Sequence, residues 1–353
     1  MKRSRSTIKK PFGRKPFGVF GETMVGTYLY LATSIGLFII TQANGYWNIV
    51  GHTLTDKSLT AVLASGGVIL AGTAEGIWRS SDNGRSWSGA NEALAIRHIR
   101  WMAGSADVPV IILVGTEPAG IFVSRDSGET WYQNEEVGKL RDKNGWFLPY
   151  SPEAGCVRGF AIAESGPHKA RVYAAVEVGG VLISDDGGQK WHLAEGSDGK
   201  PDLTRESDAM IHPDVHSISV HPSSSDLVTA ATGGGLYRTT DGGRTWKCIY
   251  RCYIRAAWVD TQDAQHIIAG PADGVSRNGR IEETHDGGRS WQPASVGINS
   301  PWPRHMVERF YQHDKNLFAI LSNGELWTRS SGHAVWQRIL PEVSGIQAMA
   351  ASN

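Results

Sequence analysis

The stretch Thr239-Thr-Asp-Gly-Gly-Arg-Thr-Trp246 belongs to a pattern that the chain repeats five times. In each copy an aspartate stands five residues before a tryptophan, and a glycine stands three residues before it. The aspartate can cap backbone amides in a turn, the glycine allows a positive φ, and the tryptophan offers a large apolar surface to a neighbouring sheet. We therefore expect each copy to be a structural hairpin and assign none of its aspartates to an active site. The five tryptophans are Trp87, Trp131, Trp191, Trp246 and Trp291.

Two degenerate copies complete the set of repeats. The segment that ends at Trp47 lacks the aspartate, and the segment that ends at Trp336 lacks both the aspartate and the glycine. Successive tryptophans then stand 40 to 60 residues apart, which is the range expected for four-stranded propeller blades. The sequence therefore predicts an all-β fold, a seven-bladed β-propeller of four-stranded antiparallel blades.

The repeat resembles the Asp-box, or BNR, repeat of sialidases, sortilin-type receptors, several glycosidases and the Ycf48-type photosystem assembly factors. The resemblance spans about residues 24 to 350, essentially the whole chain after its N-terminal segment. It implies a propeller of the WD40, YVTN and BNR-like kind. It is specific for architecture and says little about chemistry.

The two ends of the chain are expected to share one blade. The first blade has no innermost strand ahead of it, and the apolar segment 346–350 matches the missing strand. Such closure removes open sheet edges and predicts a single domain over residues 24–353. The apolar run 24–40 then supplies two strands of the first blade, so we expect no transmembrane helix.

Residues 1–23 are predicted to form a basic, disordered extension. The first fifteen residues carry seven cations and no acid. A tail that binds an anionic membrane or a nucleic acid is the alternative. The whole chain has 35 basic and 35 acidic residues, so the propeller itself offers no general case for nucleic-acid binding. Three sparse cysteines, Cys156, Cys248 and Cys252, suit a reducing compartment, and we expect a cytoplasmic protein.

The innermost strands point to a site at the mouth of the central channel. When they are aligned by their apolar pattern, one column is wholly polar, and the column two residues later is wholly apolar. Packing explains the second column and does not explain the first. The polar column is Thr60, Arg100, Arg158, His216, Arg255, Glu308 and Gln347.

Three arginines near one axis repel one another unless an anion or a carboxylate lies between them. One interpretation is therefore a site where Arg100, Arg158 and Arg255 bind a carboxylate, phosphate or sulfate group. The other is a channel plugged by arginine–glutamate pairs, with Glu308 and neighbouring glutamates as partners.

Other polar groups are expected on the same face. Turns and loops around the channel mouth supply candidate binding groups at His98, Glu117, Arg251 and Arg304, and candidate acid–base groups at Asp214, Tyr253 and Glu177. A metal site is a further hypothesis, with His212 and His216 as ligands and His98 or His305 as the third. No cofactor is firmly implied.

The resemblance to sialidases suggests an enzyme acting on an anionic small molecule or glycan. Asp-box sialidases hold a substrate carboxylate with three arginines, and use a tyrosine–glutamate pair as nucleophile and an aspartate as acid. The resemblance implies that Tyr253 with Glu177 or Glu308 is the nucleophile and that Asp214 is the acid, with His216 as a further acid–base group. The six blades and the Phe/Tyr-Arg-Ile-Pro motif of that family are missing here, which favours another hydrolase or lyase over a sialidase.

Two alternatives remain. A seven-bladed Ycf48-like protein would hold a protein partner on its arginine-rich face and needs no acid–base pair. A metal-dependent enzyme would use His212 and His216. A deep pocket that contains Tyr253, Asp214 and a glutamate would favour the enzyme, whereas a shallow arginine-lined face would favour the protein partner.

Overall fold

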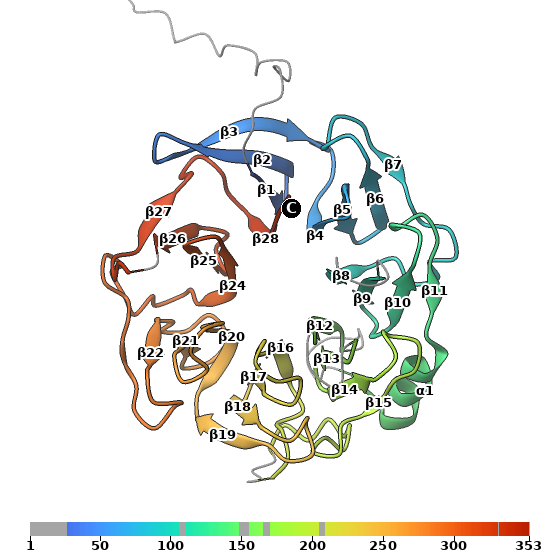
Figure 1. The fold of residues 1–353 in the computed structure, drawn as a ribbon, viewed down its shortest axis with the longest axis vertical. Helices are drawn as coiled ribbons and strands as arrows, with labels where there is room; N and C mark the ends of the chain where they lie inside the picture. The colour runs from blue at the N-terminus through green and yellow to red at the C-terminus, as the bar shows by residue number, and fades with distance from the viewer. Residues whose placement is uncertain are drawn as a thin grey trace, which may run out of the picture.

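Seven sheets stand in a ring around a central channel (Figure 1). The computed structural model describes residues 27–105, 111–147, 155–164, 170–204, 209–330 and 332–352. Each sheet has four antiparallel strands, so the predicted seven-bladed β-propeller is confirmed. The predicted basic extension, residues 1–23, lies outside the described residues.

Four concentric rings of strands build the blades. The innermost strands are β28 (Ile346–Ala351), β4 (Leu59–Ser65), β8 (Ile99–Ser105), β12 (Val157–Ile162), β16 (Val215–Val220), β20 (Tyr253–Val259) and β24 (Val307–His313). The second strands are β1 (Tyr28–Thr33), β5 (Val68–Thr73), β9 (Ile111–Thr116), β13 (Val172–Val176), β17 (Val228–Thr232), β21 (Ile267–Ala272) and β25 (Asn316–Leu321). The third strands are β2 (Gly36–Ala43), β6 (Gly76–Ser80), β10 (Ile121–Ser124), β14 (Gly180–Ser184), β18 (Gly235–Thr239), β22 (Glu282–Thr284) and β26 (Leu326–Ser330). The outermost strands are β3 (Tyr46–Thr53), β7 (Ser88–Gly89), β11 (Tyr132–Gln133), β15 (His192–Leu193), β19 (Lys247–Tyr250), β23 (Gln292–Pro293) and β27 (Gln337–Ile339).

The C-terminal strand closes the ring. Strand β28 pairs antiparallel with β1, so the first blade has the order β28-β1-β2-β3, as predicted. The Tyr28 amide donates a hydrogen bond of 3.0 Å to Ser352 Oγ, which places the two ends of the described chain side by side. The apolar N-terminal run therefore forms β1 and β2. No helix in the described part of the chain is long and apolar enough to span a membrane.

The repeated box forms a tight turn and a contact between adjacent blades. In the copy that ends at Trp131, Asp126 Oδ1 accepts hydrogen bonds from the amides of Glu129 and Thr130, at 3.1 and 3.0 Å. Gly128 has a φ of 83°. Trp131 is 1% exposed, and its Nε1 donates 2.9 Å to the carbonyl oxygen of Ala90, in the connection that leaves the preceding blade. The box residues thus fix a turn and a contact between blades, as expected.

The box aspartates predict a loss of stability in acid. Hydrogen bonds from Ser86 lower the pKa of Asp82 to about 2. Burial raises the pKa of Asp126 and of Asp241, but hydrogen bonds within their own turns outweigh it and bring each pKa to about 2. Because these folded values lie below the ordinary 3.8, their stabilisation is complete above about pH 4 and is lost as the pH falls towards 2.

Guanidinium unfolding at about pH 7, 4, 3 and 2 measures this dependence. We expect the free energy of unfolding to stay nearly constant down to about pH 4 and then to fall steeply. The double variant Asp82→Asn, Asp241→Asn should be less stable at pH 7 and should lose less stability below pH 4. A wild-type stability that does not change between pH 4 and 2 would show that the boxes do not stabilise the fold in this way.

The apolar core lies between neighbouring blades. One cluster joins Tyr173 and Val181 of the blade β12–β15 to Val228, Tyr237 and Trp246 of the next blade. All five side chains are at most 2% exposed. Each blade therefore depends on its neighbours for burial, which fits one cooperative unit.

The one α-helix of the described chain, α1 (Glu135–Asn144), lies at the outer edge of the ring (Figure 1). Asn134 caps its start by accepting a hydrogen bond from the Val137 amide, and Gly145 ends it in a left-handed conformation. Trp146 then enters the core, and its Nε1 donates 2.7 Å to the Gly199 carbonyl oxygen. The helix therefore supports the blade from outside and does not cover the channel.

Candidate functional site

A β-bulge at the leading end of every innermost strand builds the channel mouth. At each bulge the pairing register skips a residue, and in all seven blades that residue is polar; in β20 the shift also includes Ala256. A bulge bends the strand and redirects side chains. The seven side chains line one cavity of about 290 Å³. They are Thr60, Arg100, Arg158, His216, Arg255, Glu308 and Gln347.

The three arginines predicted to converge do so, and each has a glutamate partner. Arg100 Nε lies 3.3 Å from Glu117 Oε2. Arg158 Nη1 lies 3.2 Å from Glu177 Oε1, and its Nη2 lies 3.8 Å from Glu308 Oε2. The closest pair is Arg255 with Glu308. The charges that the sequence placed at the mouth are therefore largely balanced, as the alternative of arginine–glutamate pairs expected.

A fourth arginine, Arg309, was missed by the sequence prediction. Its guanidinium stacks on the indole of Trp101, with 3.9 Å from Cζ to the ring centroid. No carboxylate among the described residues lies within ion-pair distance of it. Burial and the charges of Arg158 and Arg100 lower the pKa of Arg309 to about 9. For Arg255, by contrast, Glu308 outweighs burial and the pKa is raised. Within the described chain, Arg309 is therefore a cation without a close counter-ion.

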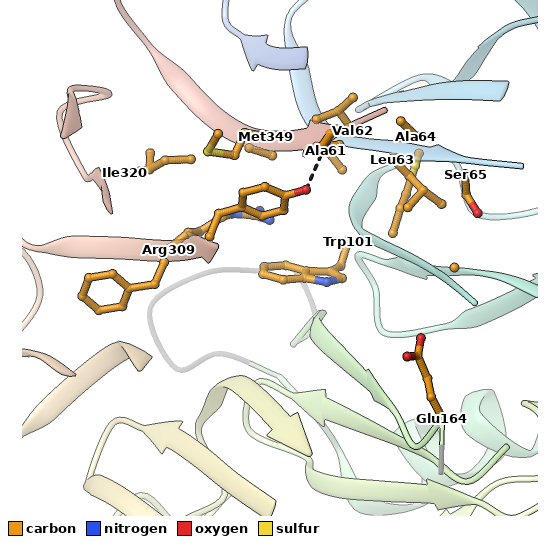
Figure 2. A pocket seen from close by; sticks show the side chains of 17 residues that line it. Ala61, Val62, Leu63, Ala64, Ser65, Trp101, Glu164, Arg309, Ile320 and Met349 are labelled. Atoms are coloured by element: carbon orange, nitrogen blue, oxygen red, sulfur yellow. Dashed lines mark hydrogen bonds between the residues drawn. The ribbon is translucent and has the colours of Figure 1, made fainter. Parts of the chain in front are cut away.

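Trp101 and Arg309 divide the channel. Both line the cavity at the mouth, and both also line a second cavity of about 380 Å³. Figure 2 shows this second cavity, into which the two side chains reach from β8 and β24, on blades that are not neighbours. Apolar residues of the predicted apolar column complete its wall, among them Val62 and Met349. The stacked pair thus forms the floor of the mouth cavity.

The sequence does contain a feature that distinguishes Trp101 and Arg309 from the equivalent residues of the other blades. Trp101 and Arg309 directly follow the polar residue of their bulges, and the other five blades have small residues there. The small residues are Ala61, Gly159, Ser217, Ala256 and Ala348. Strict alternation assigns this position to the other face of the strand, whereas the bulge turns it towards the channel. Without the bulge, the two large side chains could not be recognised as a pair.

Of the predicted acid–base residues, His216 and Glu308 line the mouth cavity, and Asp214, Tyr253 and Glu177 are not among its described lining. His216 Nε2 lies 3.1 Å from Asp214 Oδ2, and His216 Nδ1 lies 2.9 Å from the carbonyl oxygen of Ile254. Burial raises the pKa of Asp214, but His216 and then Arg158 outweigh it, so the net shift is downward and Asp214 stays ionised. Burial raises the pKa of Tyr253, whose Oη accepts a hydrogen bond from Arg255 Nε at 3.1 Å. Neither Asp214 nor Tyr253 belongs to the described lining of the mouth cavity.

The proposed histidine ligands do not come together. His212 Nε2 lies 3.1 Å from the Leu203 carbonyl oxygen, and its Nδ1 accepts a hydrogen bond from the Asp214 amide. Within the described chain, ligand atoms of His216 group instead with those of Glu177 and Asp214. Arg158 already binds Glu177, so a positive charge stands beside this buried group.

The remaining predicted rim residues lie around the cavity and not in its described lining. His98 Nδ1 stands 3.8 Å from Glu117 Oε2, so it joins the Arg100 pair. Arg251 and Arg304 are exposed, and His305 is half-buried. The mouth is therefore made by the seven bulge residues and by the Trp101–Arg309 floor.

Comparison with known proteins gives the fold and no closer relationship. No family profile matches the chain, and no curated protein sequence matches it. Among solved structures, an ancestral GH74 enzyme has 15% identity and a TM-score of 0.58. That match covers 79% of this chain but 38% of the enzyme, so the chain spans well under half of the enzyme's length.

Two Ycf48 structures match over most of both chains. Ycf48 bound to D1 peptide has 14% identity and a TM-score of 0.57, and the match covers 87% of this chain and 89% of Ycf48. Ycf48 from Cyanidioschyzon merolae has 12% identity and a TM-score of 0.55, over 88% of this chain and 97% of that protein. At these identities the likeness establishes architecture alone. The chain is a seven-bladed β-propeller similar to Asp-box propellers, which include both enzymes and binding proteins.

Proposed function

We propose that this propeller is a binding protein without catalytic activity, which holds an acidic side chain of a partner protein in the mouth of its channel. The observation that carries the proposal is the Arg309 cation in the floor of the mouth, which has no carboxylate partner among the residues that the structure describes. Arg100, Arg158 and Arg255 each have a glutamate partner there, whereas Arg309 has no carboxylate within ion-pair distance in the described chain. A carboxylate that enters the cavity would supply the close partner that Arg309 lacks.

The size and polarity of the cavity suit such a group. Its volume of about 290 Å³ is at the lower end of the range for small-molecule pockets. The Arg309 guanidinium stacks on the Trp101 indole, and this stacked pair blocks a ligand from passing deeper into the channel. A glutamate or aspartate side chain is short enough to end at this floor, with its carboxylate beside Arg309.

The state of the acid–base groups argues against catalysis. A general acid must hold a proton at the working pH, and His216 with Arg158 keeps Asp214 ionised. Both ring nitrogens of His216 already face acceptors, Asp214 Oδ2 and the Ile254 carbonyl oxygen. The Tyr253 phenol is buried and bonded to Arg255. These groups hold one another in place and leave no free base at the cavity wall.

The similarity in length and fold to Ycf48 favours a protein partner over a small acid. Ycf48, which matches this chain over most of both lengths, has been seen with a D1 peptide. That complex shows that a propeller of this size can present a peptide site. It says nothing of which partner this chain would bind.

Two pools of random peptides test the proposal. One pool carries a fixed central glutamate and the other a fixed central glutamine, and each is passed over the immobilised protein. A hydrogen-bonded charge contributes about 1.5–3 kcal/mol, so retention of the glutamate pool should be roughly 10- to 100-fold stronger. Equal retention of the two pools would overturn the proposal. Stabilisation by acetate or succinate with no retained peptide would also overturn it, and would favour the hydrolase or lyase alternative.

A further inference from the structure

We infer a second site, for a divalent transition-metal ion such as Zn²⁺, on the blade β20–β23, where His266, Glu283 and His285 meet. One ligand atom from each of these three side chains lies within 4.8 Å of the other two. The site is separate from the channel mouth, because none of the three residues lines the mouth cavity.

The strand register brings the three side chains to one face. Ile267 pairs with Thr284 and Ile268 pairs with Glu283, so the same register sets His266 opposite His285. Glu283 and His285 are two residues apart and share a face of the extended chain. The two imidazole rings stack with their centroids 4.3 Å apart and their planes at 19°. A cross-strand histidine pair with a diagonal glutamate results.

His266 is oriented as a metal-binding histidine would be. Its Nδ1 lies 3.2 Å from Asp260 Oδ2, so Nδ1–H donates to the carboxylate and leaves a lone pair on Nε2. Trp258 packs edge-on against the ring at 5.4 Å and holds it in place. Nε2 is buried and has no hydrogen-bond partner within the described chain. A buried acceptor without a donor is rare, and a bound ion is one partner that would satisfy it.

The two histidines approach different oxygens of the Glu283 carboxylate, at distances slightly longer than the ligand spacing of a tetrahedral ion. His266 Nε2 lies 3.6 Å from Glu283 Oε2, and His285 Nε2 lies 3.7 Å from Glu283 Oε1. Bonds to zinc of about 2.0–2.1 Å set two tetrahedral ligands roughly 3.3–3.4 Å apart. Two imidazoles and one carboxylate leave a fourth position for water, a ligand set that zinc accepts.

The carboxylate is also positioned from outside the site. Arg329 Nη2 lies 3.5 Å from Glu283 Oε2, and Gln292 Nε2 donates to Oε1 at 3.3 Å. Such outer partners orient a ligand. The guanidinium charge lowers the affinity for a cation, so we expect a moderate site and not one on which folding depends.

Other blades show that the box does not require this cluster. The position of His285 in the box is taken elsewhere by Ser81, Arg125, Asp185 and Thr240. In one of these blades the cross-strand pair is an ordinary ion pair, Arg171 with Asp185 at 2.6 Å. The histidine pair is therefore a feature of its own blade.

Titration of tag-free protein with Co²⁺, followed by visible absorption and by displacement with Zn²⁺, tests the site. Wild type should bind one ion per chain in a tetrahedral environment with nitrogen and oxygen ligands. His285→Ala, at a side chain that is 56% exposed, should fold normally and lose more than the roughly 10- to 100-fold in affinity that removal of an outer partner costs. Asp260→Asn should weaken binding by that smaller factor and keep the stoichiometry.

His192→Ala, at another exposed histidine, is the matched control and should bind like wild type. Three outcomes would overturn the inference. They are a folded wild type that binds no cobalt, a His285→Ala variant with unchanged affinity, and a spectrum that shows thiolate ligation by one of the cysteines.

Discussion

Removal of residues 346–353 is expected to unfold the whole ring and not only its first blade. The deletion takes away β28, which supplies the innermost strand of that blade. It also removes Ile346 and Met349, which are 2% and 6% exposed. These two side chains alone represent about 3–6 kcal/mol of apolar burial, a large share of the 5–15 kcal/mol that stabilises a typical protein. It also leaves β1 with an open edge.

A circular permutant is the control for this deletion. The ends at Tyr28 and Ser352 are hydrogen-bonded, so a short glycine linker can join them, with new ends opened between β3 and β4. The permutant keeps every strand and should melt cooperatively near the wild-type temperature. Circular dichroism and thermal melting measure both chains. A deletion variant that melts like wild type would show that the closing strand does not stabilise the ring.

Arg309→Met is expected to raise the melting temperature while abolishing the preference for acidic peptides. Methionine keeps an apolar chain against Trp101. It removes a charge that has no close carboxylate in the described part of the chain. A half-buried charge without a close counter-ion costs stability, so its removal should stabilise the fold. The same change takes away the cation that we assign to the ligand, so the glutamate and glutamine pools should be retained equally.

Substitutions of two other arginines serve as controls for Arg309→Met. Arg255→Met should lower the melting temperature, because it leaves Glu308 without its closest partner. Arg244→Gln removes an exposed cation from a box turn at the opposite ends of the strands, and should change neither stability nor peptide retention. A lower melting temperature for Arg309→Met would show that Arg309 is a structural plug. Unchanged discrimination between the two pools would show that it is not the anion site.

The fold could be predicted because its signals are local and repeated. Each box needs an aspartate, a glycine and a tryptophan at fixed spacing, since the turn and the contact with the next blade depend on them. Seven tryptophans therefore give the number of blades. The closing strand was found because the first blade lacked an inner strand and residues 346–350 had a matching apolar pattern.

The site could be predicted only in part, because it depends on which side chains of each inner strand face the channel. The polar column was found, since its residues stand at one position of the aligned repeats. The bulge at this position is set by pairing with the neighbouring strand, and simple alternation along the sequence would assign Trp101 and Arg309 to the wrong face. The histidine pair of His266 and His285 depends on register between strands, which spacing along the chain does not give.

A double-mutant cycle tests the central claim most directly. One peptide from the retained glutamate pool and its glutamine counterpart are titrated calorimetrically into wild type and into Arg309→Met. If Arg309 binds the carboxylate, the two changes are coupled, and the interaction energy should be about 1.5–3 kcal/mol. If the glutamate-to-glutamine change costs the same in both proteins, the coupling is zero, and the carboxylate is bound elsewhere on the propeller.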